Sequence, residues 1–206
     1  MTAADPGAAM APPVFTCRRL TLLVTGSVNA ALVPYWLHWL RQMYPDLTVS
    51  VGVSPMAQRF VQLDALRALA SGAVWADSWE STDLPEGAHI GIESQAECFG
   101  VFPATINTTM RLAAGFTDTP TMMALQLTKK PIAIASTFPG TNEIVKRRCA
   151  ELERRPNLRF TGTLPAFSVS AGDWSGTTGF FMPLLLTVLE ELRTASNEVP
   201  SPTETK

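Results

Sequence analysis

Short apolar runs with the composition of β-strands alternate with helix-forming segments along most of the chain, and this alternation constrains the fold more than any other feature. The strand-type runs are predicted at residues 20–24, 47–53, 97–102, 131–135 and 158–161. The helices are predicted at residues 27–43, from 54 onward, and at 105–115, 122–128, 142–154 and 180–196. Such short apolar strands are typical of a parallel sheet with both faces covered by helices. The sequence therefore predicts a three-layer α/β domain.

The 206 residues suit one domain with some additional tail. Residues 1–15 are rich in Ala, Pro and Gly, and residues 196–206 are polar with two prolines, so both ends are expected to be disordered. The folded domain is expected to span residues 16–195, because no linker interrupts that part.

Charge and cysteine content limit the classes of partner. The net charge is −2 and no basic stripe is present, which argues against nucleic acid and anionic membranes as partners. Charged residues make up only 17% of the chain, which favours burial of surface in a homo-oligomer. Cys17, Cys98 and Cys149 are odd in number and widely spaced, so neither a disulfide framework nor a zinc motif is indicated. No apolar run is long enough to cross a membrane, and a cytoplasmic location is expected.

Ligands of parallel α/β domains bind beyond the carboxyl ends of the strands, so polar residues after the predicted strands are candidate contacts. After the first strand, Thr25, Gly26 and Ser27 open a helix that also carries Asn29, and Ser54 follows the second strand. Hydroxyl groups and backbone N–H groups at a helix start favour a phosphate. The alternative for Ser27 and Ser54 is ordinary helix capping.

Polar residues also follow two later predicted strands. Pro103, Ala104, Thr105, Asn107 and Thr108 follow the predicted strand 97–102. The next strand end contributes Ser136, Thr137 and Asn142, and Asn142 is also a candidate N-cap.

A Gly- and hydroxyl-rich segment, residues 168–179, has Trp174 at its centre, which suggests a lid, or else an exposed linker. Of the two histidines, His38 lies in a predicted helix beside tryptophans and is expected to be structural. His89 is expected in a loop that enters a strand, and it is the candidate for proton transfer near neutral pH. No serine-hydrolase, paired-carboxylate or metal motif is present.

Taken together, residues 18–195 resemble the homo-oligomeric flavin-containing cysteine decarboxylases, which include phosphopantothenoylcysteine decarboxylase and the lantibiotic peptidyl-cysteine decarboxylases. Pro103-Ala104-Thr105-Ile106-Asn107-Thr108 is similar to the family's Pro-Ala-Ser-Ala-Asn-Thr motif and is the most specific match. Pro139-Gly140-Thr141-Asn142 resembles its Pro-x-Met-Asn motif, with Thr141 in place of the methionine. His89 falls where the family has its active-site histidine.

The resemblance implies a flavodoxin-like, Rossmann-like domain that binds FMN, with FAD as the alternative. The flavin contacts it implies are Thr25, Gly26, Ser27, Asn29, Ser54, Pro103, Ala104, Thr105, Asn107, Thr108, Ser136 and Thr137. His89 would be the catalytic base, and Asn142 would hold the substrate carboxylate or the flavin edge. The substrate clamp implied by the family comprises Ala171, Gly172, Asp173 and Trp174.

The implied reaction is oxidative decarboxylation of a C-terminal cysteine, giving an enethiol for an aminovinyl-cysteine ring. The coenzyme A branch has a clamp cysteine where this chain has Ala171, which favours the branch that modifies a ribosomally made precursor peptide. The family further implies trimers, in some cases assembled into dodecamers. The alternatives are a phosphopantothenoylcysteine decarboxylase-like or flavin prenyltransferase-like enzyme, a non-catalytic flavin-binding regulatory subunit, or a protein that binds another phosphate ligand.

Overall fold

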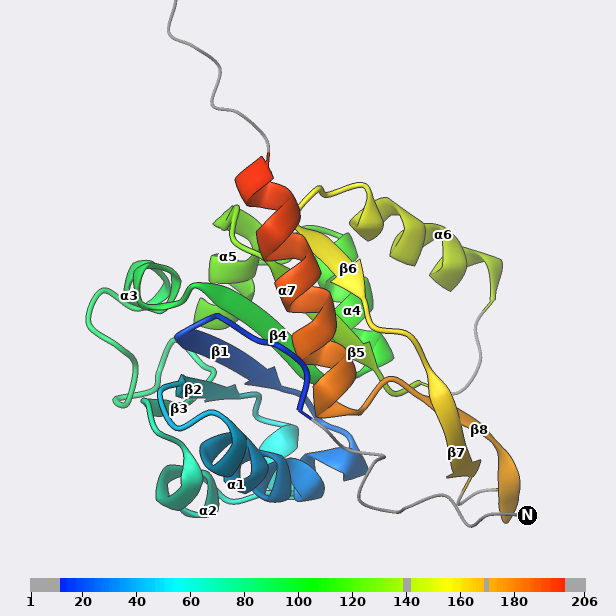
Figure 1. Cartoon of the computed structure of the whole chain (residues 1–206), viewed down its shortest axis with the longest axis horizontal. Coiled ribbons are helices and arrows are strands. Elements are labelled where there is room, and N and C mark those ends of the chain that lie inside the picture. Colours follow the sequence, from blue (N-terminus) through cyan, green and yellow to red (C-terminus); the bar gives the residue numbers. More distant parts are fainter. Residues whose placement is uncertain (1–11, 139–141, 169–170, 199–206) are drawn as a thin grey trace, which may run out of the picture.

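The computed structural model describes residues 12–138, 142–168 and 171–198, and they form a parallel sheet between two layers of helices (Figure 1). The strands of this sheet are β1 (Arg19–Val24), β2 (Thr48–Val53), β3 (Val74–Ala76), β4 (Cys98–Ala104), β5 (Ile132–Ser136) and β6 (Leu158–Phe160). Their order is β3-β2-β1-β4-β5-β6, and all neighbours are parallel. The predicted three-layer α/β fold is confirmed.

Two hydrophobic cores lie on the two faces of the sheet. Alternate residues of a strand point to opposite faces, so Leu22 belongs to one core and Leu23 to the other. The first core lies under α1 (Val33–Met43), α2 (Leu63–Leu69) and α7 (Met182–Glu198). The second lies under α3 (His89–Gln95), α4 (Ile106–Ala113), α5 (Pro120–Leu127) and α6 (Glu143–Glu153). Two 3₁₀ helices, η2 (Val28–Leu32) and η3 (Ala57–Arg59), follow β1 and β2.

The structure corrects three local expectations. Strand β3 was not predicted, because its three residues are too few to show a hydrophobic period. His89 is the first residue of helix α3, not part of a loop entering a strand; Ile92 is buried and Ile90 is exposed, which suits a helix packed on one side. The segment expected as a lid or linker, residues 168–179, includes the second strand of an antiparallel hairpin formed by β7 (Leu164–Ser168) and β8 (Asp173–Thr178).

Both ends of the chain are partly described. The hydroxyl of Tyr44 donates a hydrogen bond to the Pro13 carbonyl oxygen at 2.6 Å, and the ring of Phe15 packs edge-on against that of Tyr44. Helix α7 continues to Glu198, two residues past the start of the predicted tail. Residues 1–11 and 199–206 lie outside the described part, so the disordered tails stay predictions. No described helix combines the length and hydropathy that a membrane crossing requires.

Strands β1 and β4 are neighbours at the centre of the sheet, and the chain leaves them in opposite directions. After β1 it turns toward β2 and β3, and after β4 it turns toward β5 and β6. The loops therefore diverge at the carboxyl ends of β1 and β4, where doubly wound folds place their ligands.

Candidate functional site

A cavity of about 690 Å³ lies at the divergence of these loops, and its size is within the range of about 300–1,000 Å³ that is usual for small-molecule sites. Many of the predicted cofactor contacts line it: Thr25, Gly26, Ser27, Ser54, Thr105, Asn107, Thr108 and Thr137. They come from the loops after β1, β2, β4 and β5. The structure thus brings together residues that are more than 100 positions apart in the sequence.

The side chain of Thr25 joins the two central strands beneath the cavity. Its hydroxyl donates to the Pro103 carbonyl oxygen at 2.7 Å and accepts from the Thr105 amide at 2.9 Å. Thr25 is only 1% exposed, so these hydrogen bonds are shielded from water. They fix the end of β1 to the end of β4 and hold the divergent loops in place.

Two capped helix starts line the cavity. Ser27 caps η2, with its Oγ accepting from the Asn29 amide, and Thr105 caps α4, with its Oγ1 accepting from the Thr108 amide. The amides of Gly26 and Asn107 have no hydrogen-bond partner among the described residues. Unpaired N–H groups at such turns, helped by the helix dipole, can hold an anion. A Cβ at Gly26 would lie 2.5 Å from the Met56 Cβ, so only glycine lets the two loops approach this closely.

The cavity lining also includes residues that the sequence does not predict: Asp77, Arg111, Asp118, Thr119 and Met122. Asp77 follows β3, so the strand-end rule would have found it had that strand been predicted. The other four lie within or after α4, away from any strand end, so the strand-end rule does not predict them.

The Asp77 carboxylate is 1% exposed and supports the start of α5. It accepts from the Thr119 hydroxyl at 2.7 Å and from the Thr121 amide at 2.9 Å. Burial raises the pKa of Asp77, and the nearby charge of Asp118 adds to this, against the lowering effect of the hydrogen bonds.

We expect Asp77→Ala to lower the free energy of unfolding by about 1–3 kcal/mol, because the buried Thr121 amide would lose its acceptor. Asp77→Asn is the matched control, since it retains the size and one acceptor oxygen, and it should lose less. Denaturant titration of both variants measures the difference. Equal losses would contradict the role assigned to the hydrogen bond.

The same pair tests the pH dependence. Because the folded state raises the pKa of Asp77, the associated stability is present below the unfolded pKa and is lost as the pH rises through the folded pKa. Asparagine does not titrate. The stability of Asp77→Asn relative to the native chain should therefore rise from pH 4 to neutrality, and a flat difference would contradict the raised pKa.

The two predicted catalytic residues lie outside the cavity lining of a single chain. His89 begins α3 after Gly87 and Ala88, both of which have positive φ angles. Its ring packs edge-on against the Trp79 ring, with 5.8 Å between the ring centroids. The buried Nδ1 atom of His89 has no hydrogen-bond partner among the described residues. Asn142 caps α6 by accepting from the Val145 amide at 3.0 Å, which is the capping role weighed from the sequence. Pro139, Gly140 and Thr141 lie outside the described residues.

Several predicted contacts do not line the cavity themselves. Pro103 and Ala104 are buried in β4, and Asn29 lies in η2. The carbonyl oxygen of Ser136 accepts a hydrogen bond from the Gly179 amide. These predicted contacts belong to the strand ends and the 3₁₀ helix beside the residues that line the cavity.

The predicted clamp residues lie at the exposed end of the β7–β8 hairpin. Ala171, Gly172 and Asp173 are exposed, and Trp174 is 73% exposed with its ring against that of Phe167. Hydrogen bonds from Ser175 lower the pKa of the Asp173 carboxyl.

The donor set of the cavity fits a phosphate joined to a flat heterocycle. Arg111 is the one lysine or arginine among the described lining residues, and it is already paired with Asp118 and stacked over the Phe116 ring. A phosphate would therefore be held by hydroxyls and amides, as in other anion-binding turns. Leu23, Ile106, Met122 and Phe138 give the same cavity an apolar part for a ring. No cluster of three metal-ligating side chains occurs within the described ranges.

Comparison with known proteins agrees with this geometry. The family model "Flavoprotein" matches residues 15–168. The chain is 46% identical over 179 residues to a cypemycin cysteine dehydrogenase (decarboxylating) from Streptomyces, covering 87% of this chain and 94% of that protein. It is similar to the crystal structure of the cypemycin decarboxylase CypD, with a TM-score of 0.80, 44% identity, and coverage of 91% and 100%.

A more distant structural relative is EpiD in complex with the substrate peptide DSYTC, with a TM-score of 0.71, 19% identity, and coverage of 85% and 99%. At this identity the likeness shows the fold alone. The predicted kinship with flavin-containing decarboxylases is confirmed by the family match and the Streptomyces relative: this chain belongs to the Flavoprotein family.

Proposed function

We propose that this chain is a flavin-dependent decarboxylase that oxidises and decarboxylates the C-terminal cysteine of a precursor peptide. The observation that carries the proposal is the cavity at the β1/β4 divergence, lined by the hydroxyl and amide donors of Thr25–Ser27 and Thr105–Thr108. The 46% identical Streptomyces relative is named for dehydrogenation and decarboxylation of a cysteine. FMN is the proposed cofactor and FAD the alternative.

In this mechanism the chain binds the flavin, orients the substrate cysteine and transfers a proton. The turns at Gly26 and Asn107 would hold the phosphate, and the apolar lining would receive the ring. When bound, a flavin supplies a two-electron acceptor for the hydride of the cysteine β-carbon. A thiolate is a better hydride donor than a thiol, and free cysteine has a pKa of about 8.5, so His89 is assigned as the base that takes the thiol proton. The resulting thioaldehyde lies β to the carboxylate, which leaves as carbon dioxide. This leaves an enethiolate, which takes up a proton to give the enethiol.

Asn142 is proposed to hold the substrate carboxylate through its amide. A neutral hydrogen-bond donor orients the carboxylate without the ion pair that would stabilise it against leaving. In the described structure the Oδ1 of Asn142 accepts from the Val145 amide. The side-chain NH₂ has no partner among the described residues and can donate to the substrate.

We propose that the complete site forms between subunits of a homo-oligomer, for which the family resemblance implies a trimer. Two observations support this. His89 and Asn142 do not line the cavity of their own chain. Large apolar side chains near the cavity and around His89 are exposed in the single chain, among them Val28, Met56, Trp79 and Ile90, as expected for a surface that a second copy covers.

The β7–β8 hairpin is proposed as the peptide clamp. Trp174 and Phe167 present an exposed aromatic pair at its surface, and aromatic pairs are common anchors for peptides. Ala171 provides no thiol at the hairpin end, so reduction of the product by a clamp cysteine has no reagent there. This supports a peptide substrate and an enethiol product.

The test is to incubate the flavin-loaded protein with a synthetic peptide ending in cysteine. We expect a mass loss of about 46 Da, which corresponds to carbon dioxide and two hydrogens. A peptide ending in serine and the cysteine peptide with an amidated C-terminus are the controls, and both should remain unchanged.

Other outcomes would identify the rival functions. Turnover of phosphopantothenoylcysteine but not of the peptide would favour the coenzyme A branch. A flavin-loaded protein that turns over neither substrate would favour a binding role. A colourless protein that does not take up FMN or FAD would remove the proposed oxidant.

A further inference from the structure

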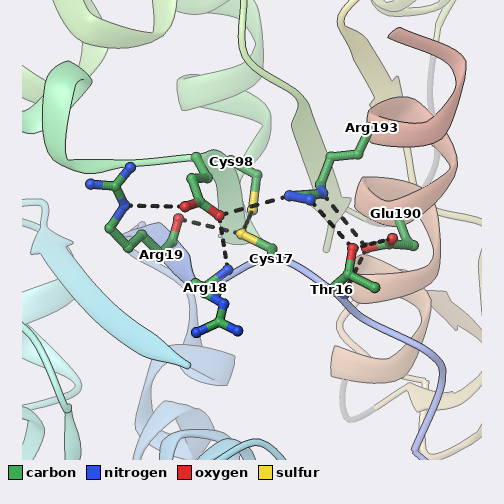
Figure 2. Close-up of polar contacts among 8 residues, drawn as sticks. Thr16, Cys17, Arg18, Arg19, Cys98, Glu190 and Arg193 are labelled. Atoms are coloured by element: carbon green, nitrogen blue, oxygen red, sulfur yellow. Dashed lines mark hydrogen bonds and ion pairs between the residues drawn. The ribbon is translucent and has the colours of Figure 1, made fainter. Parts of the chain in front are cut away.

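The thiols of Cys17 and Cys98 face each other at the amino-terminal edge of the sheet, at the opposite end of β4 from the cavity (Figure 2). Their Sγ atoms are 2.7 Å apart, and the residues are 4% and 0% exposed. Cys149 lies on α6 and belongs to no such pair among the described residues. The pair takes no part in the proposed reaction.

Contacts between the segment that precedes β1 and the start of β4 bring the two cysteines together. Cys17 lies three residues before Leu20, which is the parallel partner of Cys98 in the β1–β4 ladder. The backbone amide of Arg18 donates to the Glu97 carboxylate at 2.9 Å. The contact between the two sulfur atoms therefore depends on the course of the segment before β1 and not on the register of the ladder.

A polar network holds the segment that carries Cys17 (Figure 2). The hydroxyl and amide of Thr16 donate to the Glu190 carboxylate at 2.6 and 2.9 Å, and Arg193 reaches Thr16 from the same helix, α7. Arg19 adds an ion pair to Glu97 at 3.3 Å. These contacts fix the segment against both β4 and α7, and the two thiols meet as a consequence of the fold.

The distance between the sulfur atoms is close to that of a bond. Non-bonded carbon atoms prefer separations of about 3.5–4.0 Å, and sulfur is larger than carbon. A disulfide bond is about 2.0 Å long. A small movement of the two sulfur atoms would bring them to bonding distance.

We propose that Cys17 and Cys98 form an intramolecular disulfide when the protein meets a low-molecular-weight disulfide such as oxidised glutathione. One thiolate attacks the glutathione disulfide and releases one glutathione thiol. The other thiolate then displaces the second glutathione. An S–S bond forms between the cysteines, two thiol protons are lost, and two electrons pass to the two glutathione molecules.

Burial sets the order and the rate of these steps. Burial raises the pKa of the Cys98 thiol, and Cys98 is fully inaccessible, so the first attack is assigned to Cys17. Since Cys17 is also buried, the reaction requires opening of the segment that precedes β1. Such segments open locally at a lower cost than the whole fold. The cross-link should therefore form slowly, and because it lies far from the cavity it should leave cofactor binding unchanged.

The experiment is to incubate the flavin-loaded full chain with oxidised glutathione and to follow intact mass and thiol content under denaturing, non-reducing conditions. We expect a loss of about 2 Da from two thiol protons, a decrease from three free thiols to one, and a proteolytic peptide that joins Cys17 to Cys98. The oxidised chain closes a loop of about 80 residues, so its melting temperature should rise by roughly 10 °C and fall again with dithiothreitol.

Cys149→Ser is the matched control and should oxidise like the native chain, whereas Cys17→Ala should show neither the cross-link nor the temperature shift. If Cys17→Ala folds poorly, the mass measurements on the native chain still show whether Cys17 and Cys98 are cross-linked. Three thiols remaining after prolonged oxidation, a cross-link that includes Cys149, or a disulfide only between chains would each overturn the proposal.

Discussion

The His89→Asn variant is expected to lose about 10²–10⁴-fold in the rate of peptide decarboxylation while keeping its flavin. An imidazole is a base near neutral pH, and general base catalysis contributes about this factor. Asparagine keeps a similar size and polarity but cannot take the thiol proton. The buried Nδ1 of His89 has no hydrogen-bond partner among the described residues, so no described contact of that atom is broken. Single-turnover rates with a cysteine-terminated peptide measure the effect.

The chain provides a matched control for this substitution. His38 is exposed on α1 and is the other histidine of the sequence. His38→Asn should retain native rates and native flavin absorbance. If the two variants lose activity equally, or if His89→Asn loses its flavin, the assignment of His89 as the catalytic base would be wrong.

Much of the cavity could be predicted because the same residues both end a strand and begin a helix. Ser27 and Thr105 are N-caps, and short polar side chains after an apolar run are a local signal that a sequence displays. Parallel topology then places such strand ends at one edge of the sheet. This rule predicts that Thr25, Ser54 and Thr108 lie close together, and the structure brings these residues to one cavity.

The lining residues Asp77 and Thr119 could not be predicted because their positions depend on tertiary packing. Strand β3 is three residues long, and it is defined by its pairing with β2 more than by its own composition. Asp77 was therefore not recognised as a strand-end residue. Thr119 faces the cavity because α5 packs against α3 and α4, and no local pattern encodes that arrangement.

The position of His89 shows a different limit. Ile90, Gly91 and Ile92 alternate like a strand, but the positive φ angles of Gly87 and Ala88 direct the chain into a helix. Sequence order alone does not say whether His89 reaches the cavity of its own chain. The single chain leaves it outside the lining, and this is why the proposed site includes a second subunit.

Gly26→Ala is expected to weaken flavin binding by roughly 10–100-fold. The new Cβ would lie 2.5 Å from the Met56 Cβ, so the loops after β1 and β2 must move apart. That movement displaces the Gly26 amide and Ser27 from the phosphate, and one hydrogen bond to a charged group contributes about 1.5–3 kcal/mol. The overpacked contact also costs about 1–3 kcal/mol of stability. The ratio of flavin to protein absorbance after purification, and titration of the flavin-free protein with FMN, measure the loss of affinity.

Gly162→Ala separates this local effect from a general sensitivity to added side chains. Gly162 has no atom within 4 Å of an added Cβ, so the same chemical change should leave both flavin content and melting temperature unchanged. Circular dichroism of Gly26→Ala should show a folded protein with lowered flavin occupancy, because the contact lies at the cavity rim and not in either core. If Gly26→Ala binds FMN as tightly as Gly162→Ala does, the turn after β1 does not hold the phosphate, and the flavin would have to bind at another surface of the molecule.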